Sequence, residues 1–275
     1  MKIASKSLIT TSPTVPIYDV IKIMSKEGFR RVPTVDSGTR RLEGLVTSTD
    51  LIDYLGGGEK FQLIRKKSAG NFFKAINEPV RIIMERDLLM IDERSDLRET
   101  LELMLEYGVG GIPIVDDKNR IVAMITERDI MNHFIDKIMG VKVEELMTRE
   151  VVSINAETTI IDAERIMIEQ GFRRLPIVSE EEIIAVVTAM DIIRFFGSKR
   201  VFQHLQSGMI TQVLESPIIE ISSKEIIDIH PQEDVSQAAN LMRKQSVGGL
   251  PVVEGKKLVG MITERDFLKL LKKEF

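Results

Sequence analysis

The chain has 275 residues, a formal net charge of −4 and no cysteine, which excludes disulfides, thiolate nucleophiles and Cys-ligated zinc. Its acidic balance offers no general attraction to nucleic acid or anionic membrane, so any anion site has to be built locally. No apolar run approaches the length of a membrane span, and residues 1–13 lack the apolar core of a signal peptide. We therefore expect a cytoplasmic protein with neither a membrane nor a nucleic acid as its partner.

Four segments share one succession of predicted elements: an apolar strand, an amphipathic helix, a strand that contains proline, a second strand and a further helix. In chain order, the proline-containing strands are 32–35, 112–115, 175–178 and 250–253, and their hairpin partners are 42–46, 121–125, 183–187 and 258–262. The first helix carries an apolar stripe at helical spacing, formed in repeat one by Ile17, Val20, Ile21 and Met24 and in repeat four by Val235, Ala238, Ala239 and Met242. The pattern predicts a β-α-β-β-α unit that occurs four times.

These units predict repeats at 1–57, 79–139, 140–197 and 217–275, with helical linkers at 58–78 and 198–216. Alternate repeats are the most alike, since 28–31 (Gly-Phe-Arg-Arg) recurs at 171–174 and 124–129 recurs in full at 261–266. The chain is therefore interpreted as a duplicated pair of repeats with its boundary near 139–143. One repeat has too little core to fold alone. We expect consecutive repeats to pair, and the helical segments 59–77 and 199–215 to cover the outside of each pair.

Each repeat ends in the order small-apolar-apolar-Thr-x-x-Asp, at residues 44–50, 123–129, 185–191 and 260–266. This ending, the proline in the second strand and the order of elements resemble the CBS (cystathionine-β-synthase) domain family over nearly the whole chain. The resemblance implies an α/β (α+β) fold in which four CBS repeats pair into two Bateman modules and form a pseudo-two-fold disc, similar in layout to the γ subunit of AMP-activated protein kinase. Ala123 and Ala185 stand where the family usually has glycine, and we expect slight crowding at both.

The Thr-x-x-Asp sequence has two interpretations. It can cap a helix, because Thr and Asp at these positions satisfy backbone N–H groups of the first turn. It can also bind a ligand, because a carboxylate accepts hydrogen bonds from adjacent hydroxyls and a helix N-terminus favours an anion. The resemblance implies the second role, with Asp on a ribose and Thr on ribose or phosphate. The residues concerned are Thr47, Asp50, Thr126, Asp129, Thr188, Asp191, Thr263 and Asp266.

Two arginine pairs are candidate phosphate ligands. Arg30 and Arg31 directly precede the proline strand of repeat one, and Arg173 and Arg174 precede that of repeat three. They are either solvated surface charges, which contribute little, or guanidinium groups that capture a phosphate. The resemblance implies the phosphate contact.

Repeats two and four have glycine pairs at these positions. They carry Arg128 and Arg265 beside the ligand Asp instead, and we expect these arginines to reach a neighbouring site. The resemblance also places the adenine edge against the turn after each first strand, without assigning a chemistry to its side chain. The residues at that turn are Thr11, Asp92, Asn155 and His230.

The sequence therefore predicts a regulatory, energy-sensing protein that binds AMP, ADP or ATP in clefts between paired repeats and signals to a regulated protein by changing conformation. Two alternatives stay open: a sensor of another adenosyl ligand such as S-adenosylmethionine, and a structural adaptor that binds no ligand. No nucleophile–base pair, metal cluster or glycine-rich phosphate loop indicates an enzyme. The regulated partner is unknown, and the sequence does not decide whether the protein forms a homodimer. The sites of Asp50 and Asp191 are expected to bind most tightly, because only their repeats also carry the arginine pairs.

Overall fold

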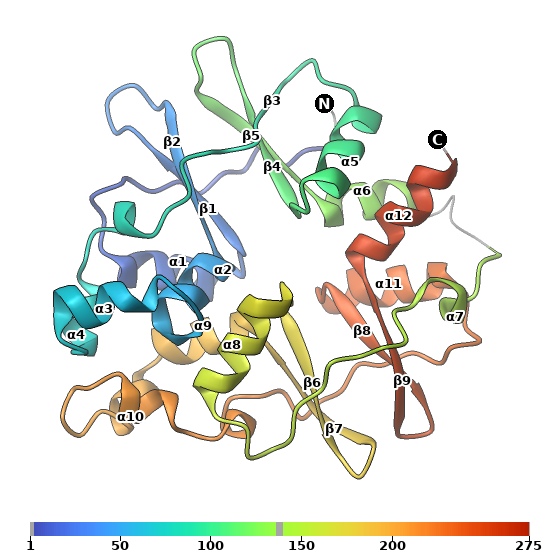
Figure 1. Cartoon of the computed structure of the whole chain (residues 1–275). Coiled ribbons are helices and arrows are strands. Elements are labelled where there is room, and N and C mark those ends of the chain that lie inside the picture. The colour runs from blue at the N-terminus through green and yellow to red at the C-terminus, as the bar shows by residue number, and fades with distance from the viewer. Residues whose placement is uncertain (1–2, 136–139, 275) are drawn as a thin grey trace. The chain divides into compact units, whose positions relative to one another are not determined.

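A computed structural model describes residues 3–135 and 140–274 of the chain (Figure 1). The expected end of repeat two at residue 139 lies outside the described residues. The chain divides into two compact units, each built from two alternate repeats. The odd-repeat unit spans 9–88 and 152–226 and contains repeats one and three; the even-repeat unit spans 1–8, 89–151 and 227–275 and contains repeats two and four.

The four predicted hairpins are confirmed. Each pairs two antiparallel strands, with the proline of the first strand opposite an apolar residue of the second. In each hairpin the register shifts between the first and second residues after the proline. The strands are β1 Arg31–Val35 with β2 Leu42–Thr47, β4 Gly111–Val115 with β5 Ile121–Thr126, β6 Arg174–Ser179 with β7 Glu182–Thr188, and β8 Gly249–Glu254 with β9 Lys257–Thr263.

The leading strand of each repeat is shorter than expected. Only β3, Ile91–Asp92, forms a strand, which pairs in parallel with β4. In the other repeats it is a single parallel bridge, between Thr11 and Thr34, Ile154 and Ile177, and Ile229 and Val252. In repeats one and four a proline follows closely and cannot donate a further ladder hydrogen bond, which limits the strand.

The helices follow the predicted pattern. The first helix of each repeat buries one apolar stripe, and the second begins directly at the end of the hairpin. The first helices are α1 Ile17–Glu27, α5 Leu97–Glu106, α8 Ile160–Gln170 and α11 Val235–Gln245. The second helices are α2 Ser48–Ile52, continued by the π-helix η1 Asp53–Gly57, then α6 Glu127–Phe134, α9 Ala189–Gly197 and α12 Glu264–Glu274.

Each hydrophobic cluster joins alternate repeats. In the odd-repeat unit α1 packs on α9 and α8 packs on η1, and in the even-repeat unit α12 packs on α5 and α6. A single repeat has too little core to fold alone, and here a helix from the alternate repeat of the same unit completes the core. The expected pairing of consecutive repeats, the boundary near 139–143 and the disc are relations between the two units, and they stay predictions.

The two linkers lie in the same unit. The segment 59–77 is helical as expected, with α3 Phe61–Ser68 and α4 Phe72–Ile76, whereas 199–215 forms the short 3-10 helix η4 Lys199–Gln203 and α10 Thr211–Leu214. The interruption falls around Gly208, whose φ of 76° is left-handed. Both linkers pack into the core of the odd-repeat unit. Their expected position on the outside of each pair stays a prediction, because each pair joins the two units.

Each hairpin also receives a chain segment from a neighbouring part of its unit. Leu45 of β2 exchanges two backbone hydrogen bonds with Glu85, both 2.9 Å long. The corresponding bridges join Met124 to Ser5, Val186 to Ser223 and Met261 to Thr148. The close approach explains the small residue one position earlier, since a Cβ on Gly44 would lie 2.9 Å from the Glu85 carbonyl oxygen. The remaining short helices are α7 Val143–Leu146, η2 Val80–Ile82 and η5 Ile218–Glu220.

Candidate functional site

The four Thr-x-x-Asp sequences form the same hydrogen-bonded turn at the start of the second helix. In repeat three, Oδ2 of Asp191 accepts hydrogen bonds from the Thr188 backbone N–H at 2.8 Å and from Thr188 Oγ1 at 2.6 Å. The turns at Thr47, Thr126 and Thr263 repeat both contacts within about 0.2 Å. The capping interpretation is therefore correct for all four. It occupies only one oxygen of each aspartate, so the other oxygen decides what else the turn can do.

A cation contacts the second oxygen in three of the four repeats. Arg194 Nη1 lies 3.0 Å from Oδ1 of Asp191, and Lys269 Nζ lies 3.1 Å from Oδ1 of Asp266. Lys60 Nζ donates to Oδ1 of Asp50. A diol that binds any of these aspartates would therefore compete with a cation for the acceptor oxygen or share that oxygen with it.

Asp129 is the exception. Its Oδ1 has no hydrogen-bond partner among residues 3–135 and 140–274. Burial raises the pKa of the Asp129 carboxyl, and the nearby Glu264 carboxylate raises it further, against hydrogen bonds from Thr126 that lower it. Asp129, whose Oδ1 accepts no hydrogen bond from a cation among the described residues, thus also gives up its proton less readily than an ordinary aspartate.

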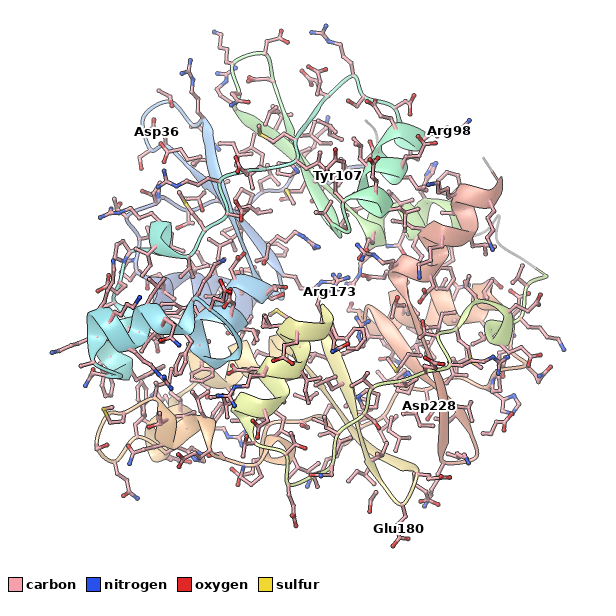
Figure 2. All side chains as sticks on the ribbon, in the orientation of Figure 1. Asp36, Arg98, Tyr107, Arg173, Glu180 and Asp228 are labelled. Carbon is pink, nitrogen blue, oxygen red and sulfur yellow. The ribbon has the colours of Figure 1, made fainter. Side chains whose placement is uncertain are left out.

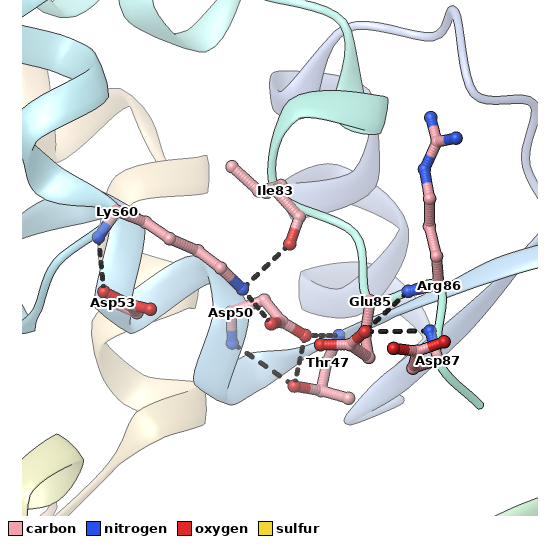
Figure 3. A network of polar contacts seen from close by, with 8 residues as sticks. All are labelled: Thr47, Asp50, Asp53, Lys60, Ile83, Glu85, Arg86 and Asp87. Carbon is pink, nitrogen blue, oxygen red and sulfur yellow. Dashed lines mark hydrogen bonds and ion pairs between the residues drawn. The ribbon is translucent and has the colours of Figure 1, made fainter. Parts of the chain in front are cut away.

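Lys60 ties the turn of repeat one to the linker that follows it (Figure 3). Its Nζ also donates to the Ile83 carbonyl oxygen at 2.9 Å, and its backbone N–H donates to Oδ1 of Asp53 at 2.8 Å. Burial raises the pKa of Asp53, and the contacts with Lys60 oppose that shift. The sequence does not predict this role of Lys60, because nothing in the linker pattern indicates that its side chain contacts Asp50.

The hairpin register brings the arginine pairs next to the Thr-x-x-Asp turns. Arg31 lies directly opposite Thr47, and Arg174 directly opposite Thr188. Directly opposed residues of an antiparallel pair have Cβ atoms about 4.5–5.5 Å apart. The residue before each, which is Arg173 in repeat three (Figure 2), accepts a backbone hydrogen bond from the first residue of the following helix. In repeats one and three, one hairpin end therefore carries both a carboxylate and two guanidinium groups.

Glycine takes that place in the other unit. Gly111 lies opposite Thr126 and Gly249 opposite Thr263. These hairpin ends keep the carboxylate and lack the guanidinium pair.

Arg128 and Arg265 form reciprocal ion pairs inside the even-repeat unit. Arg128 Nε lies 2.6 Å from Oε1 of Glu264, and Arg265 Nε lies 3.0 Å from Oε1 of Glu127. Both glutamate side chains are 1% exposed, whereas the arginines are about one-third exposed. Each arginine thus neutralises a buried carboxylate of the other repeat, and a nucleotide phosphate would have to compete with that carboxylate. Their expected role at a neighbouring ligand site stays a prediction.

The turn positions after the leading strands share a local role despite their varied side chains. Oδ1 of Asp92, Oδ1 of Asn155 and Nδ1 of His230 each accept a hydrogen bond from the backbone N–H two residues on, at 2.8, 3.0 and 3.3 Å. The assignment of Thr11 to this position is wrong by one residue, because Thr11 forms the strand bridge as Ile154 and Ile229 do. Ser12 occupies the turn position in repeat one, and its Oγ lies 3.5 Å from the Thr14 backbone nitrogen. Asp92, Asn155 and His230 therefore stabilise the turn through local hydrogen bonds.

A fifth Thr-x-x-Asp turn serves as an internal comparison. Thr159 caps α8, its Oγ1 lies 2.7 Å from Oδ2 of Asp162, and Arg165 Nη1 lies 3.2 Å from Oδ1 of the same residue. This turn reproduces the threonine side-chain and arginine contacts of Thr188–Asp191–Arg194 at a helix start that follows no hairpin, but among the described residues it lacks the backbone N–H contact to the aspartate. The capping contacts by themselves therefore do not define a ligand site; the neighbouring arginine pair distinguishes the turns of repeats one and three.

The part of the chain that the structure describes contains no group of three or more histidine, aspartate or glutamate residues placed to hold a metal ion. Within the same residues, none of the helices has the length and apolar character needed to cross a bilayer.

Comparison with known proteins identifies the family. The CBS domain model matches residues 2–57, 80–136, 143–198 and 218–273. An uncharacterized protein of Methanocaldococcus jannaschii, MJ1225, is 38% identical over 272 residues, which cover 98% of this chain and 97% of the relative. An uncharacterized 33.4 kDa protein of Thermofilum pendens is 34% identical over 255 residues, or 93% of this chain and 85% of that protein.

Solved structures agree with this relationship. The crystal structure of MJ1225, described as a suggested archaeal homologue of γ-AMPK, has a TM-score of 0.94 at 37% identity and covers 98% of this chain and 99% of its own. A conserved protein of Pyrococcus horikoshii shares the fold at 22% identity, with a TM-score of 0.62 over 98% of this chain and 97% of that one. The family model spans four segments that together take up most of the chain. The chain therefore belongs to the CBS domain family.

Proposed function

We propose that this protein is a regulatory sensor that binds an adenine nucleotide, AMP, ADP or ATP, through the Thr-x-x-Asp turns of repeats one and three and signals to a regulated protein. The observation that carries the proposal is the hairpin register, which sets Arg31 opposite Thr47 and Arg174 opposite Thr188. A ribose diol needs a carboxylate acceptor and a phosphate needs guanidinium donors, and both are present at one hairpin end. The relationship to MJ1225, a suggested γ-AMPK homologue, supports the same reading.

Binding would exchange partners at the aspartate. In repeat one, the ribose hydroxyls would donate to Oδ1 of Asp50 in place of Lys60, whose ammonium group would then be available to the phosphate. Lys60 immediately precedes α3, so its release would alter the anchoring of the linker. This contact provides a local route from an occupied turn to a change that a partner protein could detect. The proposed function is binding and regulation without catalysis.

An adaptor that binds no ligand is the second candidate. It is favoured by the fifth turn, at Thr159 and Asp162, where similar side-chain contacts form at a helix start that follows no hairpin. A sensor of S-adenosylmethionine is less well matched, because the arginine pairs favour a phosphate over a sulfonium cation.

Calorimetric titration of Asp191→Asn and Asp162→Asn against the wild-type protein separates these candidates. Each substitution removes one carboxylate charge from a Thr-x-x-Asp turn of the same unit with an arginine on Oδ1. With AMP, ADP or ATP as ligand, we expect Asp191→Asn to remove or weaken one binding site and Asp162→Asn to bind as the wild type does. Absence of binding by the wild-type protein at millimolar nucleotide supports the adaptor, and preferential binding of S-adenosylmethionine supports that sensor.

A further inference from the structure

Two exposed phenylalanines stack on the surface of the odd-repeat unit. Phe73 of α4 is 44% exposed and Phe202 of η4 is 41% exposed. Their ring centroids lie 5.8 Å apart and their planes differ by 3°. The rings come from the two linkers, which are far apart in sequence. An exposed apolar pair where two linkers meet is typical of a surface that contacts another molecule.

The stacked pair is held in place from below. Phe72 is fully buried, packs edge-on against Phe73 at 5.8 Å and donates its backbone N–H to the Gly208 carbonyl oxygen at 2.9 Å. Ile210 returns a backbone hydrogen bond to Gly70 across the same junction. Because the backbones are tied together, the aromatic surface exists before any partner arrives, and binding loses little conformational entropy.

The two linkers carry corresponding phenylalanines that differ in exposure. The sequences Phe61-Gln62 and Phe202-Gln203 follow repeats one and three at corresponding points of the two linkers. Phe61 is only 5% exposed and belongs to the hydrophobic core, with Arg65 above its ring. The packing that buries Phe61 therefore has no counterpart at Phe202.

The surroundings of the pair are basic although the whole chain carries a net charge of −4. Lys74 follows Phe73 directly, and Lys199 lies one turn of the 3-10 helix before Phe202. The last turn of α3 adds three exposed cations, of which Lys67 lies 3.9 Å from Glu78. Lys66, Lys74 and Lys199 make no ion pair with any residue that the structure describes.

We propose that the stacked pair Phe73 and Phe202, with Lys66, Lys74 and Lys199, is a docking surface for an acidic segment of a partner protein that carries aromatic or large aliphatic side chains. Charge complementarity favours an acidic partner, since these lysines lack acidic partners among residues 3–135 and 140–274. Rigid aromatic anchors within a polar rim are typical of protein interfaces.

Other macromolecules fit less well. A single-stranded nucleic acid stacks successive bases on separate rings, whereas Phe73 and Phe202 already contact each other as a parallel pair. A membrane-surface helix presents a continuous apolar face, whereas α3 buries its apolar residues Phe61 and Ile64 in the core.

The test measures binding of a fluorescently labelled random copolymer of glutamate and tyrosine to the full chain by fluorescence anisotropy. Polyglutamate, an oligothymidylate and phosphatidylserine vesicles serve as the competing probes. We expect the copolymer to bind more tightly than all three. The double substitutions Phe73→Ser with Phe202→Ser, and Lys66→Glu with Lys74→Glu, should each weaken copolymer binding by about tenfold or more.

Matched controls exclude general effects of surface chemistry. Tyr107→Ser removes an aromatic residue that is 61% exposed in the other unit (Figure 2), and Lys118→Glu reverses an exposed charge on a hairpin loop. Both should bind the copolymer as the wild type does, and circular dichroism should show all variants folded. Equal binding by the aromatic variant and the wild type, or tighter binding of polyglutamate, the oligonucleotide or the vesicles than of the copolymer, would overturn the proposal.

Discussion

The two units differ in the residues at the start of their second helices. Where the second helices begin, the even-repeat unit has Glu127-Arg128 and Glu264-Arg265, which exchange ion pairs across the contact. The odd-repeat unit has 48–49 (Ser-Thr) and 189–190 (Ala-Met) at these positions, so it has no such pairs to form.

The odd-repeat unit relies instead on close helix contact through glycine. A Cβ on Gly57 would lie 2.8 Å from the Glu164 carbonyl oxygen, and one on Gly197 would lie 2.8 Å from Ser25 Oγ. One polar group interrupts this contact. Glu164 of α8 is 0% exposed, and neither of its carboxyl oxygens has a hydrogen-bond partner among residues 3–135 and 140–274.

The corresponding residue of α1, by alignment of 28–31 with 171–174, is Ile21, which is also fully buried. One repeat thus holds a hydrocarbon where its duplicate holds an acid. The comparison predicts that the even-repeat unit is sensitive to the loss of one partner of an ion pair and that the buried acid of Glu164 weakens the odd-repeat unit.

The largest effect is expected from breaking one ion pair of the even-repeat unit. Arg265→Ala removes the ion pair from the buried carboxylate of Glu127, which should lower the free energy of unfolding by about 3 kcal/mol, as measured by urea denaturation. Arg194→Ala removes an exposed pair from the other unit and should cost less than about 1 kcal/mol. The double substitution Arg265→Met with Glu127→Leu should recover most of the loss. Equal effects of the two single substitutions would contradict a special role for charge in the even-repeat unit.

Next in size is the removal of the buried acid. Glu164→Ile places in repeat three the residue type of repeat one and should raise the free energy of unfolding by about 1–3 kcal/mol at neutral pH, because an unsatisfied buried polar group is lost. Glu169→Gln changes an exposed acid of the same helix and should have little effect. Destabilisation by Glu164→Ile would show that the acid has a partner in solution.

The buried Glu164 also predicts how the free energy of unfolding changes with pH. Burial raises the pKa of Glu164 well above its ordinary value, although Arg165 opposes the shift. Above the ordinary pKa of glutamate the unfolded chain releases this proton while the folded chain keeps it, so stability falls as pH rises until the folded-state pKa is reached. Both Glu164→Gln and Glu164→Ile should remove this fall, which equilibrium unfolding at a series of pH values would measure.

These features also mark the limit of what the sequence predicts. The hairpins and the Thr-x-x-Asp caps depend on residues within one repeat, and their local pattern was sufficient to predict them. The ion pairs join residues 136 and 138 positions apart, so Arg128 and Arg265 could be assigned only to an unspecified neighbouring site. The side-chain contact of Lys60 and the burial of Glu164 likewise depend on how elements pack, which amphipathic spacing does not specify.

The third prediction concerns ligand affinity and compares the units directly. Arg31→Gln with Arg174→Gln removes a guanidinium beside each turn of the odd-repeat unit, where the even-repeat unit has glycine. We expect AMP to bind those turns about tenfold more weakly, because a hydrogen bond to a charged group contributes about 1.5–3 kcal/mol. Adenosine, which lacks the phosphate, should bind the variant and the wild type equally. An equal loss for AMP and adenosine in calorimetry would indicate that the arginines shape the site without contacting phosphate.

The smallest effect is expected from removing one hydroxyl of the ligand. A 2′-deoxynucleotide keeps the base and phosphate but offers one hydroxyl fewer to the acceptor oxygen of Asp50 or Asp191. Its affinity should fall by about three- to tenfold relative to the ribonucleotide, the value of one hydrogen bond. In Asp50→Asn with Asp191→Asn the ribo and deoxy forms should bind equally at these turns, because the carboxylate that distinguishes them is gone. The side-chain amide oxygen can still accept the two threonine hydrogen bonds, so helix capping and folding should survive the substitution. If the variant still prefers the ribonucleotide by the wild-type ratio, the aspartates only cap helices, and another group distinguishes the ribose from the deoxyribose.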